Sequence, residues 1–91
     1  MIENIENMDE NSKWISIKVE VVQIWENSHA TIKQVGLLGD KTGVIKFVIW
    51  ANSEHPVFKL GKSYIIRNAI ALEYNGRYQV DFNRKTVIEE I

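Results

Sequence analysis

A cation and a large aromatic residue share one face of the short run at residues 44–50. Successive side chains of a β-strand point to opposite faces, so Lys46 and Trp50 lie on the same side. A cation can contact a phosphate and an exposed ring can stack on a base, which is what binding of single-stranded nucleic acid requires. The alternative is that Trp50 closes one end of a barrel core. The positions on the other side of the run are apolar and suit a buried core: Ile45, Phe47 and Ile49.

A second aromatic residue and a second cation flank the dipeptide Asn75-Gly76. Asn-Gly is a strong signal for a two-residue hairpin, because both turn positions take positive φ. We therefore expect Tyr74 and Arg77 at the tip of a hairpin, where both can reach a ligand. The sequence predicts two stacking residues and four phosphate-binding cations: Trp50 and Tyr74 for stacking, and Lys33, Lys46, Arg67 and Arg77 for phosphate.

The other rings and cations are assigned different roles. Trp14 opens the first predicted strand and Trp25 ends it, and we assign both rings to packing. Tyr78 shares the phase of apolar neighbours and is expected in the core, whereas the role of Tyr64 stays open. The cations at positions 84 and 85 are possible further phosphate contacts, although a cation at a strand end is usually only solvated: Arg84 and Lys85.

No set of residues has the spacing of a catalytic or metal site. His29 and His55 lie in separate predicted loops, and a histidine pair without cysteine makes a poor zinc site. The chain contains no cysteine, which excludes disulfides and thiol nucleophiles. Residues 39–43 lack the spacing of a phosphate-binding loop and lead into a strand rather than a helix. We therefore expect neither an enzyme nor a metal or organic cofactor.

The formal net charge of −1 conceals an acidic N-terminal segment. Residues 1–12 contain four acidic residues and no cation, which leaves 11 basic and 8 acidic residues in the rest of the chain. This mild basic bias is compatible with an acidic partner. We expect a disordered acidic tail or linker at residues 1–12 and a single domain at residues 13–91. The sequence has neither a signal peptide nor the roughly 18 apolar residues of a membrane span, so we expect a cytoplasmic protein, associated with the nucleoid if prokaryotic.

Alternating apolar residues predict a β-protein, and the abundance of isoleucine and valine supports this. The first strand is expected at residues 14–25, where a change of phase at Val21-Val22 indicates a β-bulge that bends the strand. The second strand is expected to direct Val35 and Leu37 inward. The remaining strands follow in order, with a bulge near Asn68 in the fourth: residues 31–38, 44–50, 62–74 and 77–83, and a short closing run at residues 86–88.

The segment between the third and fourth of these strands is irregular. Pro56 excludes a central strand at residues 51–61. Val57, Phe58 and Leu60 are expected to form a short helical or irregular plug at a barrel mouth. Five strands with such a plug predict an all-β, five-stranded OB-fold, a partly open Greek-key barrel. An SH3-like barrel is the nearest alternative, but its strands are usually shorter.

Four segments resemble the DNA-binding OB domains of replication protein A, and the archaeal single-stranded DNA-binding proteins of that family look closest: residues 12–15, 37–43, 45–50 and 61–64. The resemblance extends over residues 12–88. It implies that bases stack on Trp50 and Tyr74, that Lys46 contacts the strand, and that the other three cations named above lie along it. It also implies sequence-tolerant binding of single-stranded DNA in replication, recombination or repair, with other OB domains or replication and repair proteins as partners.

Two other functions remain open from the sequence. The same barrel could be a protein-interaction or assembly domain, with Trp50 packed inward or against a partner. The same groove could bind RNA, because the choice between DNA and RNA depends on contacts to the 2′-hydroxyl that the sequence does not place.

Overall fold

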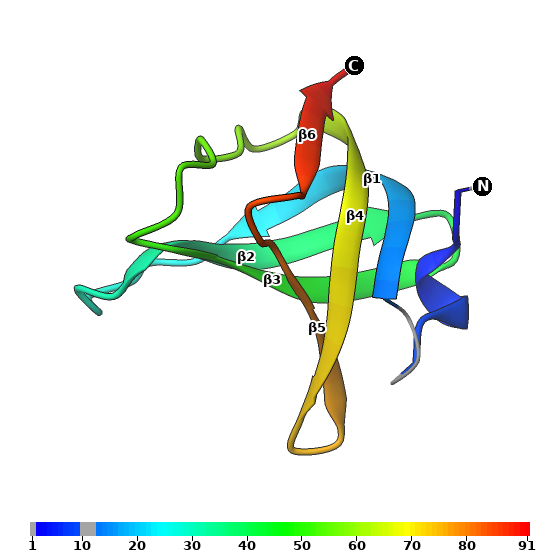
Figure 1. The fold of residues 1–91 in the computed structure, drawn as a ribbon, viewed down its shortest axis with the longest axis horizontal. Coiled ribbons are helices and arrows are strands. Elements are labelled where there is room, and N and C mark those ends of the chain that lie inside the picture. The colour runs from blue at the N-terminus through cyan, green and yellow to red at the C-terminus, as the bar shows by residue number, and fades with distance from the viewer. Residues whose placement is uncertain (1, 10–12) are drawn as a thin grey trace.

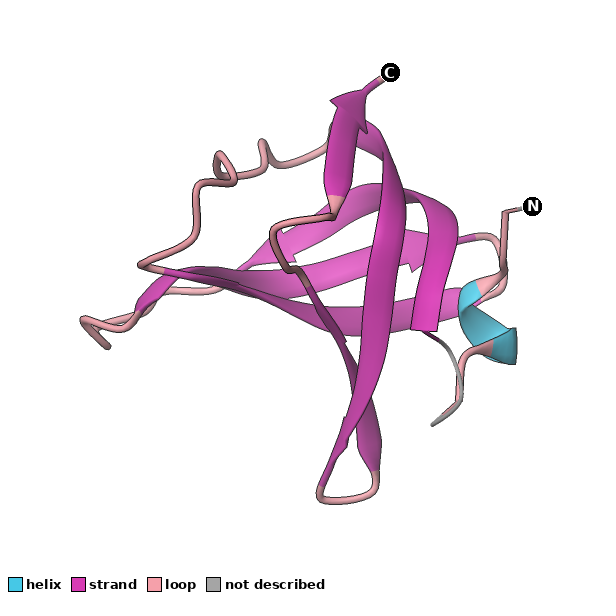
Figure 2. Ribbon diagram, in the orientation of Figure 1, coloured by secondary structure: helices cyan, strands magenta, loops and turns pink. Residues whose placement is uncertain are grey.

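The structure is a computed structural model that describes residues 2–9 and 13–91, and its strands form one strongly curved sheet (Figure 1 and Figure 2). The order in the sheet is β1-β2-β3-β5-β4-β6, and an additional pairing of β1 with β4 closes β1 to β5 into a barrel. This confirms the predicted all-β, five-stranded OB-fold. No helix of the described residues is long and apolar enough to cross a membrane. The elements are η1 (Ile5–Asn7), a 3-10 turn, and the strands β1 (Lys13–Ile24), β2 (Ile32–Asp40), β3 (Gly43–Trp50), β4 (Ser63–Tyr74), β5 (Arg77–Asp81) and β6 (Val87–Glu90).

The long strand β1 takes part in both halves of the barrel. It pairs with β2 on one side and β4 on the other, so Glu20 lies opposite both Gly39 and Ser63. The register with β2 shifts between Val21 and Gln23, at the change of phase from which the sequence predicts a bulge. An extra residue at such a point bends the strand and increases its twist, which lets one strand serve both sides of a barrel.

The β2–β3 hairpin determines which side chains enter the barrel. Leu38 is fully buried in the core, whereas Leu37 pairs with Lys46 on the outer face. Val35 is also buried, but it pairs with Val48 on that same outer face. The prediction that Val35 and Leu37 point inward is therefore wrong. Directly opposed residues of an antiparallel pair share a face, so the tight turn after β2 sets the phase of the whole strand.

Side chains from all five barrel strands fill the interior. The core residues of β1 and β3 occupy every second position, as β geometry requires, and those of β3 are the predicted inward residues Ile45, Phe47 and Ile49. Tyr78 packs against this core, as expected. Tyr64, whose role the sequence leaves open, is 5 % exposed and belongs to the core. The largest fully buried side chains are Phe47, Ile17, Leu38, Ile49, Ile66, Val21 and Val80.

The irregular segment between β3 and β4 closes one end of the barrel with the ring of Phe58. This ring is buried, and its centroid lies 5.0 Å from that of Phe47. The buried amide of Gln34 holds it in place, because its Oε1 accepts the Phe58 N–H at 2.7 Å and its Nε2 donates to the Phe58 carbonyl at 2.9 Å. This confirms an irregular plug. Val57 and Leu60 were expected in the plug but are exposed, because the segment is not a helix and its apolar residues do not share one face.

The N-terminal segment, residues 2–9, packs against the barrel. Ile5 and Met8 are 7 % and 6 % exposed and belong to the core cluster. The backbone N–H of Ile5 donates to Oδ2 of Asp40 at 2.9 Å, which fixes η1 beside the β2–β3 turn. This segment therefore differs from the disordered tail predicted for residues 1–12, because two apolar side chains and a carboxylate anchor it. The remainder of the predicted tail lies outside the described residues.

Candidate nucleic-acid interface

The outer face of β2, β3 and β5 is a continuous surface whose rows follow from the strand register. Lys46 on β3 pairs with Leu37 on β2 and with Gln79 on β5, so these three residues lie in one row across the face. Trp50 lies four residues further along β3, on the same side of the sheet. The face that the sequence identifies from the alternation in β3 is therefore present in the barrel.

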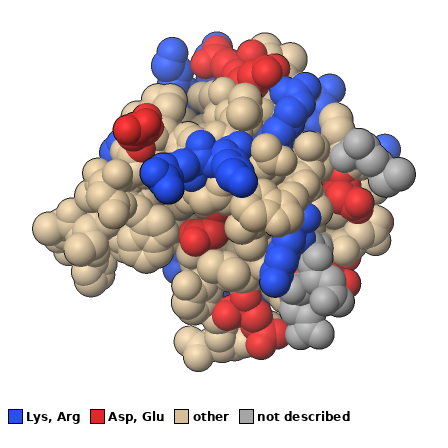
Figure 3. Space-filling view, in the orientation of Figure 1, with Lys and Arg blue, Asp and Glu red and all other residues tan. Residues whose placement is uncertain are grey.

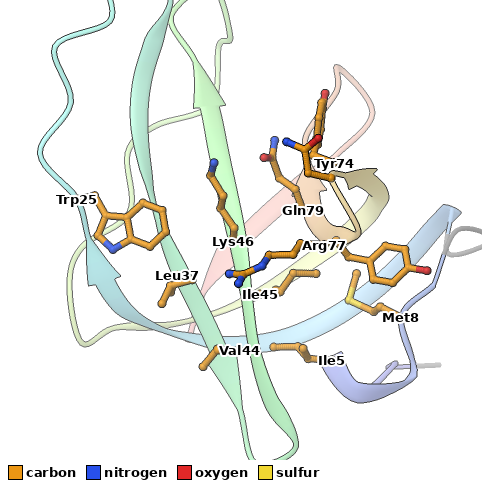
Figure 4. A pocket seen from close by; sticks show the side chains of 12 residues that line it. Ile5, Met8, Trp25, Leu37, Val44, Ile45, Lys46, Tyr74, Arg77 and Gln79 are labelled. Atoms are coloured by element: carbon orange, nitrogen blue, oxygen red, sulfur yellow. The ribbon is translucent and has the colours of Figure 1, made fainter.

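A groove of about 690 Å³ crosses this face where the end of β1, the β4–β5 hairpin and the N-terminal segment meet (Figure 4). Figure 4 shows Trp25 and Tyr74 on opposite sides of the groove, with the side chains of Lys46 and Arg77 between them. Two rings with two cations between them suit a ligand that alternates flat groups with negative charges. The lining residues are Ile5, Met8, Trp25, Leu37, Val44, Ile45, Lys46, Tyr74, Asn75, Arg77, Tyr78 and Gln79.

Trp25 is a groove residue that the sequence assigned to packing. The residue is 39 % exposed, its Nε1–H donates to Oε1 of Gln23 at 2.7 Å, and Nζ of Lys46 lies 5.9 Å from the ring centroid. A signal for this role was present, since Trp25 ends the first long strand at the loop that OB-folds use for binding. Trp14, also assigned to packing, is 53 % exposed. Both tryptophans are exposed, so the prediction that they pack in the barrel is wrong.

Tyr74 and Arg77 flank the β4–β5 turn, as the sequence predicts. Asn75 and Gly76 have φ values of 52° and 79°, the positive values that a two-residue Asn-Gly turn requires. Tyr74 pairs directly with Arg77 across the hairpin, and the tyrosine is 52 % exposed. The hairpin thus presents a ring and a cation at the edge of the groove.

Comparison with solved structures identifies the family. Over its whole length the chain is 46 % identical to the OB domain of MM0293 from Methanosarcina mazei, covers 84 % of that chain, and matches it with a TM-score of 0.90. The chain belongs to the OB-domain family. The OB domain of Ta0387 from Thermoplasma acidophilum is 19 % identical with a TM-score of 0.79, over 99 % of this chain and 86 % of that one.

More distant neighbours of this OB domain share its fold alone. The p204 HINb domain is 14 % identical with a TM-score of 0.78, over 100 % of this chain and 47 % of that one. A murine DNA-binding protein bound with double-stranded DNA is 13 % identical with a TM-score of 0.72, over 99 % and 47 % of the two chains. No family model matches the sequence, and no curated protein matches it. The specific likeness to replication protein A stays a prediction.

Trp50 of this OB domain does not line the groove. The indole is only partly exposed, and its Nε1–H donates to Oδ1 of Asp81 on β5 at 3.2 Å. Burial raises the pKa of Asp81, and hydrogen bonds from Trp50 and Gln79 offset part of that effect. The predicted stacking ring is therefore held beside a carboxylate, whereas Trp25 takes the position next to Lys46.

Lys33 and Arg67 also lie away from the groove. Nζ of Lys33 donates to the carbonyl oxygens of Ser53 and His55 at 2.8 and 3.0 Å, so this cation secures the segment between β3 and β4. Arg67 lies on β4 and forms an ion pair of 3.0 Å with Glu89 on β6. Of the six predicted site residues, the structure brings Lys46, Tyr74 and Arg77 together and does not bring Lys33, Trp50 and Arg67 to them.

The carboxylate of Asp40 joins the N-terminal wall of the groove to the β2–β3 turn. Its Oδ1 accepts the backbone N–H groups of Thr42 and Gly43 at 2.7 and 3.2 Å, and its Oδ2 accepts the N–H of Ile5. Partial burial would raise the pKa of Asp40, but the hydrogen bonds from the Thr42 hydroxyl and these backbone groups outweigh it, so the pKa is lowered. This one side chain therefore positions η1, which brings Ile5 to the groove.

The histidines occupy structural positions in loops. Nε2 of His55 lies 2.8 Å from the carbonyl oxygen of Asn83, and the backbone N–H of His29 donates to Oδ1 of Asn27 at 3.0 Å. Across residues 2–9 and 13–91, no group of three or more His, Cys, Asp or Glu side chains could hold a metal ion. The chemistry that the groove offers is stacking and charge.

Proposed function

We propose that this OB domain binds single-stranded DNA in the groove between Trp25 and Tyr74. Bases stack on these two rings, and Lys46 and Arg77 contact the phosphates that join them. The observation that carries the proposal is the groove itself, in which two partly exposed aromatic residues lie on opposite sides of two cations. This is a binding function without a catalytic step.

The expected selectivity follows from the kind of contacts. A ring can stack only on an unstacked base, so a paired duplex offers it little, and every base has a face on which a ring can stack. Phosphate contacts position a strand but carry no base information. Binding through Trp25, Tyr74, Lys46 and Arg77 should therefore favour single strands over duplex and tolerate any sequence.

The biological setting is proposed from the likeness to replication protein A. We infer a role in replication, recombination or repair, together with other OB domains or with proteins of those processes. RNA is an alternative ligand of the same groove, because its bases can stack in the same way. A double-stranded ligand is the contrasting case, since one fold neighbour was solved bound with double-stranded DNA.

A protein-interaction domain is the second candidate, and the apolar part of the groove favours it. Val44 is 59 % exposed and lies beside the apolar groove residues Ile5 and Leu37. Exposed apolar surface of this kind also occurs where proteins associate. Under this alternative the groove receives an apolar side chain of a partner, and oligonucleotides do not bind.

Titration with an unstructured oligothymidine, followed by tryptophan fluorescence, tests the proposal. Stacking of a base on Trp25 should quench the emission, and Tyr74→Ala and Lys46→Glu should both weaken binding. Lys59→Glu is the matched control, because Lys59 is exposed in the segment between β3 and β4 and does not line the groove. Duplex binding as tight as single-strand binding would refute the groove, and the absence of quenching would favour the protein-interaction domain.

A further inference from the structure

Trp14 combines two features that the barrel does not require. It has a φ of 57°, in the left-handed region, and it is 53 % exposed. A bulky residue with positive φ is a genuine outlier, because its Cβ crowds the backbone. Such conformations persist only where surrounding structure enforces them, and they concentrate at functional sites. An exposed ring gains little from packing, so its retention in this conformation calls for another role.

The surrounding structure enforces this conformation at the crossing of β1 and β4. The register of this pair shifts between Lys13 and Ile15, on either side of Trp14. On β4 the nearby Asn68 also has a positive φ, of 61°, at the bulge that the sequence predicts. The side-chain amide of Asn68 donates to the carbonyl oxygen of Lys85 at 3.0 Å, and Nζ of Lys85 lies 5.8 Å from the centroid of the Trp14 ring. A cation is thus held over an exposed ring.

The connection that carries Lys85 is fixed by its own hydrogen bonds. Oδ1 of Asn83 accepts the backbone N–H of Lys85 at 2.8 Å. The hydroxyl of Thr86, a residue 4 % exposed, donates to the carbonyl oxygen of Asn68 at 2.9 Å and accepts the N–H of Asn83 at 3.0 Å. The β5–β6 connection is therefore fastened to β4, and its cations are presented from an ordered backbone.

Further cations lie on the segments next to this ring, since Lys13 precedes Trp14 and Arg84 precedes Lys85. Figure 3 shows Lys and Arg side chains, with Asp and Glu side chains among them, on the face that carries β4 and the β5–β6 connection. Glu89 offsets part of this charge through its ion pair with Arg67. We call this surface the Trp14 patch, and its members are Lys13, Trp14, Arg67, Arg84 and Lys85.

We propose that the Trp14 patch is a second contact site for single-stranded DNA, which a strand reaches after it leaves the groove. An exposed ring with cations beside it provides the same chemistry as the groove, a face for one base and charges for the adjoining phosphates. The two surfaces share no residue, although both involve β4: Tyr74 at the end of β4 lines the groove, whereas the patch lies at the start of β1, at Arg67 on β4 and on the β5–β6 connection. As a second contact for the same strand, the patch rests on the proposed function.

Oligonucleotide length separates the two surfaces. An OB-fold covers about 4 to 16 nucleotides, so an oligothymidine of about 6 nucleotides fits one surface, whereas one of about 20 can reach both. The charge-reversal variant R84E/K85E should leave binding of the short strand unchanged and weaken binding of the long one. It should also make the salt dependence of long-strand binding shallower, by about 0.7 in the slope of log K against log salt for each phosphate that the variant no longer binds.

The matched control is K59E/K62E, which makes the same change in net charge at two exposed lysines outside both surfaces. Equal effects of the control and the patch variant on the long strand would overturn the proposal, since only overall charge would then matter. An unchanged long-strand affinity in R84E/K85E would overturn it as well. Competition by polyglutamate as effective as that by DNA of equal charge would reduce the patch to a general anion surface and also overturn the proposal.

Trp14→Gly tests the ring, because glycine accepts a positive φ without strain. Loss of the stacked base should weaken long-strand binding roughly 5- to 150-fold, the range that corresponds to the loss of one base stack. Short-strand binding should stay at the wild-type level, and Trp14→Phe should restore most of the long-strand affinity. Long-strand affinity that stays at the wild-type level in folded Trp14→Gly would overturn the role of the ring, and R84E/K85E provides the test if the glycine variant fails to fold.

The groove variant Lys46→Glu distinguishes failure of the patch from failure of the proposed function. If both surfaces bind, Lys46→Glu weakens the short and long strands, and R84E/K85E weakens only the long one. If Lys46→Glu changes neither while R84E/K85E weakens both, the groove function is refuted and the patch is a primary rather than a second site. That outcome would overturn the proposal of a second site.

Discussion

At the scale of single residues, Trp25 and Trp50 differ in the charge of the side chain beside the ring. Trp25 has the cation of Lys46 5.9 Å from its ring centroid, whereas Trp50 donates its N–H to the carboxylate of Asp81 at 3.2 Å. Lys46 therefore attracts a phosphate that approaches the Trp25 ring, whereas Asp81 repels a phosphate that approaches the Trp50 ring. The alternation in β3 places Trp50 on the correct face, but it cannot show which neighbour a ring has across the sheet.

Trp25→Ala should lower the affinity for oligothymidine by about 1–3 kcal/mol, the range for loss of one base stack. The free energy of unfolding should change little, because Trp25 is 39 % exposed at the end of β1. Fluorescence anisotropy of a labelled oligonucleotide measures the affinity, and urea unfolding measures the stability. A loss of stability with unchanged affinity would return Trp25 to the packing role that the sequence assigned to it.

Trp50→Phe should have the opposite profile. It removes one of two hydrogen-bond donors from a partly buried carboxylate, which keeps the hydrogen bond from Gln79. The free energy of unfolding should fall by about 0.5–1.5 kcal/mol, the net contribution of one hydrogen bond. Oligonucleotide affinity should stay near that of the wild type, because Trp50 does not line the groove. If Trp50→Ala instead costs affinity while Trp50→Phe costs no stability, Trp50 is the stacking residue that the sequence predicts.

At the scale of elements, local patterns predicted most of the barrel and long-range contacts account for the errors. The alternation in β3 and the Asn-Gly turn depend only on neighbours in sequence, and both are confirmed. The predicted phase of β2 was wrong because the β2–β3 turn sets it, and that turn places Gly36 opposite Phe47 on the inner face. The sequence pattern gives glycine no preferred face, whereas in the barrel a Cβ at position 36 would lie 2.1 Å from the carbonyl oxygen of Gln23 on β1.

The order of the N-terminal segment also depends on long-range contacts that local sequence patterns do not show. Its three apolar side chains, Ile2, Ile5 and Met8, are too few to predict an ordered element, and Asp40, which anchors Ile5, is 35 residues away from it in the chain. The groove wall that Ile5 and Met8 form could therefore not be predicted. Three residues of the site, Lys46, Tyr74 and Arg77, were predicted because local patterns place them: the alternation in β3 and the Asn-Gly turn.

The anchor at Asp40 predicts a pH dependence of stability. Its folded-state pKa lies below the usual value of 3.8, so the unfolded chain takes up a proton first as the pH falls. The stability that this carboxylate contributes is therefore complete above about pH 4 and is lost as the pH falls through the folded-state pKa. Urea unfolding at a series of pH values should show a steeper loss below pH 4 in the wild type than in Asp40→Asn.

Asp81 provides the control of opposite sign for that experiment. Burial raises its pKa in the folded chain above the usual value of 3.8, so protonation favours the folded state. The stability that this effect contributes is complete below about pH 4 and is lost as the pH rises through the folded-state pKa. As the pH falls, Asp81 raises the free energy of unfolding while Asp40 lowers it. Asp81→Asn should therefore make the loss of stability at low pH steeper than in the wild type. Parallel pH profiles of the wild type and Asp40→Asn would contradict the role of Asp40 as the anchor of η1.

At the scale of the whole molecule, charge is separated over a small body. The described residues span 33 × 31 × 23 Å, and the formal net charge is only −1. The acidic N-terminal segment lies along one wall of the groove, while cations gather in the groove and on the face shown in Figure 3. Net charge therefore says little about nucleic-acid binding here, and the distribution of charge decides where a strand can lie.

The salt dependence of binding measures how many of these cations a strand engages. The sequence predicts up to four phosphate contacts, but the groove contains only Lys46 and Arg77 from that set, because Lys33 and Arg67 are held elsewhere. At about −0.7 per phosphate for a single strand, the slope of log K against log salt should be about −1.4 for a short oligothymidine. A charge-neutral peptide-backbone analogue of the oligonucleotide serves as the control, and its slope should be near zero. A slope near −3 for the short strand would instead mean that four cations contact it, and that Lys33 and Arg67 leave their partners when DNA binds.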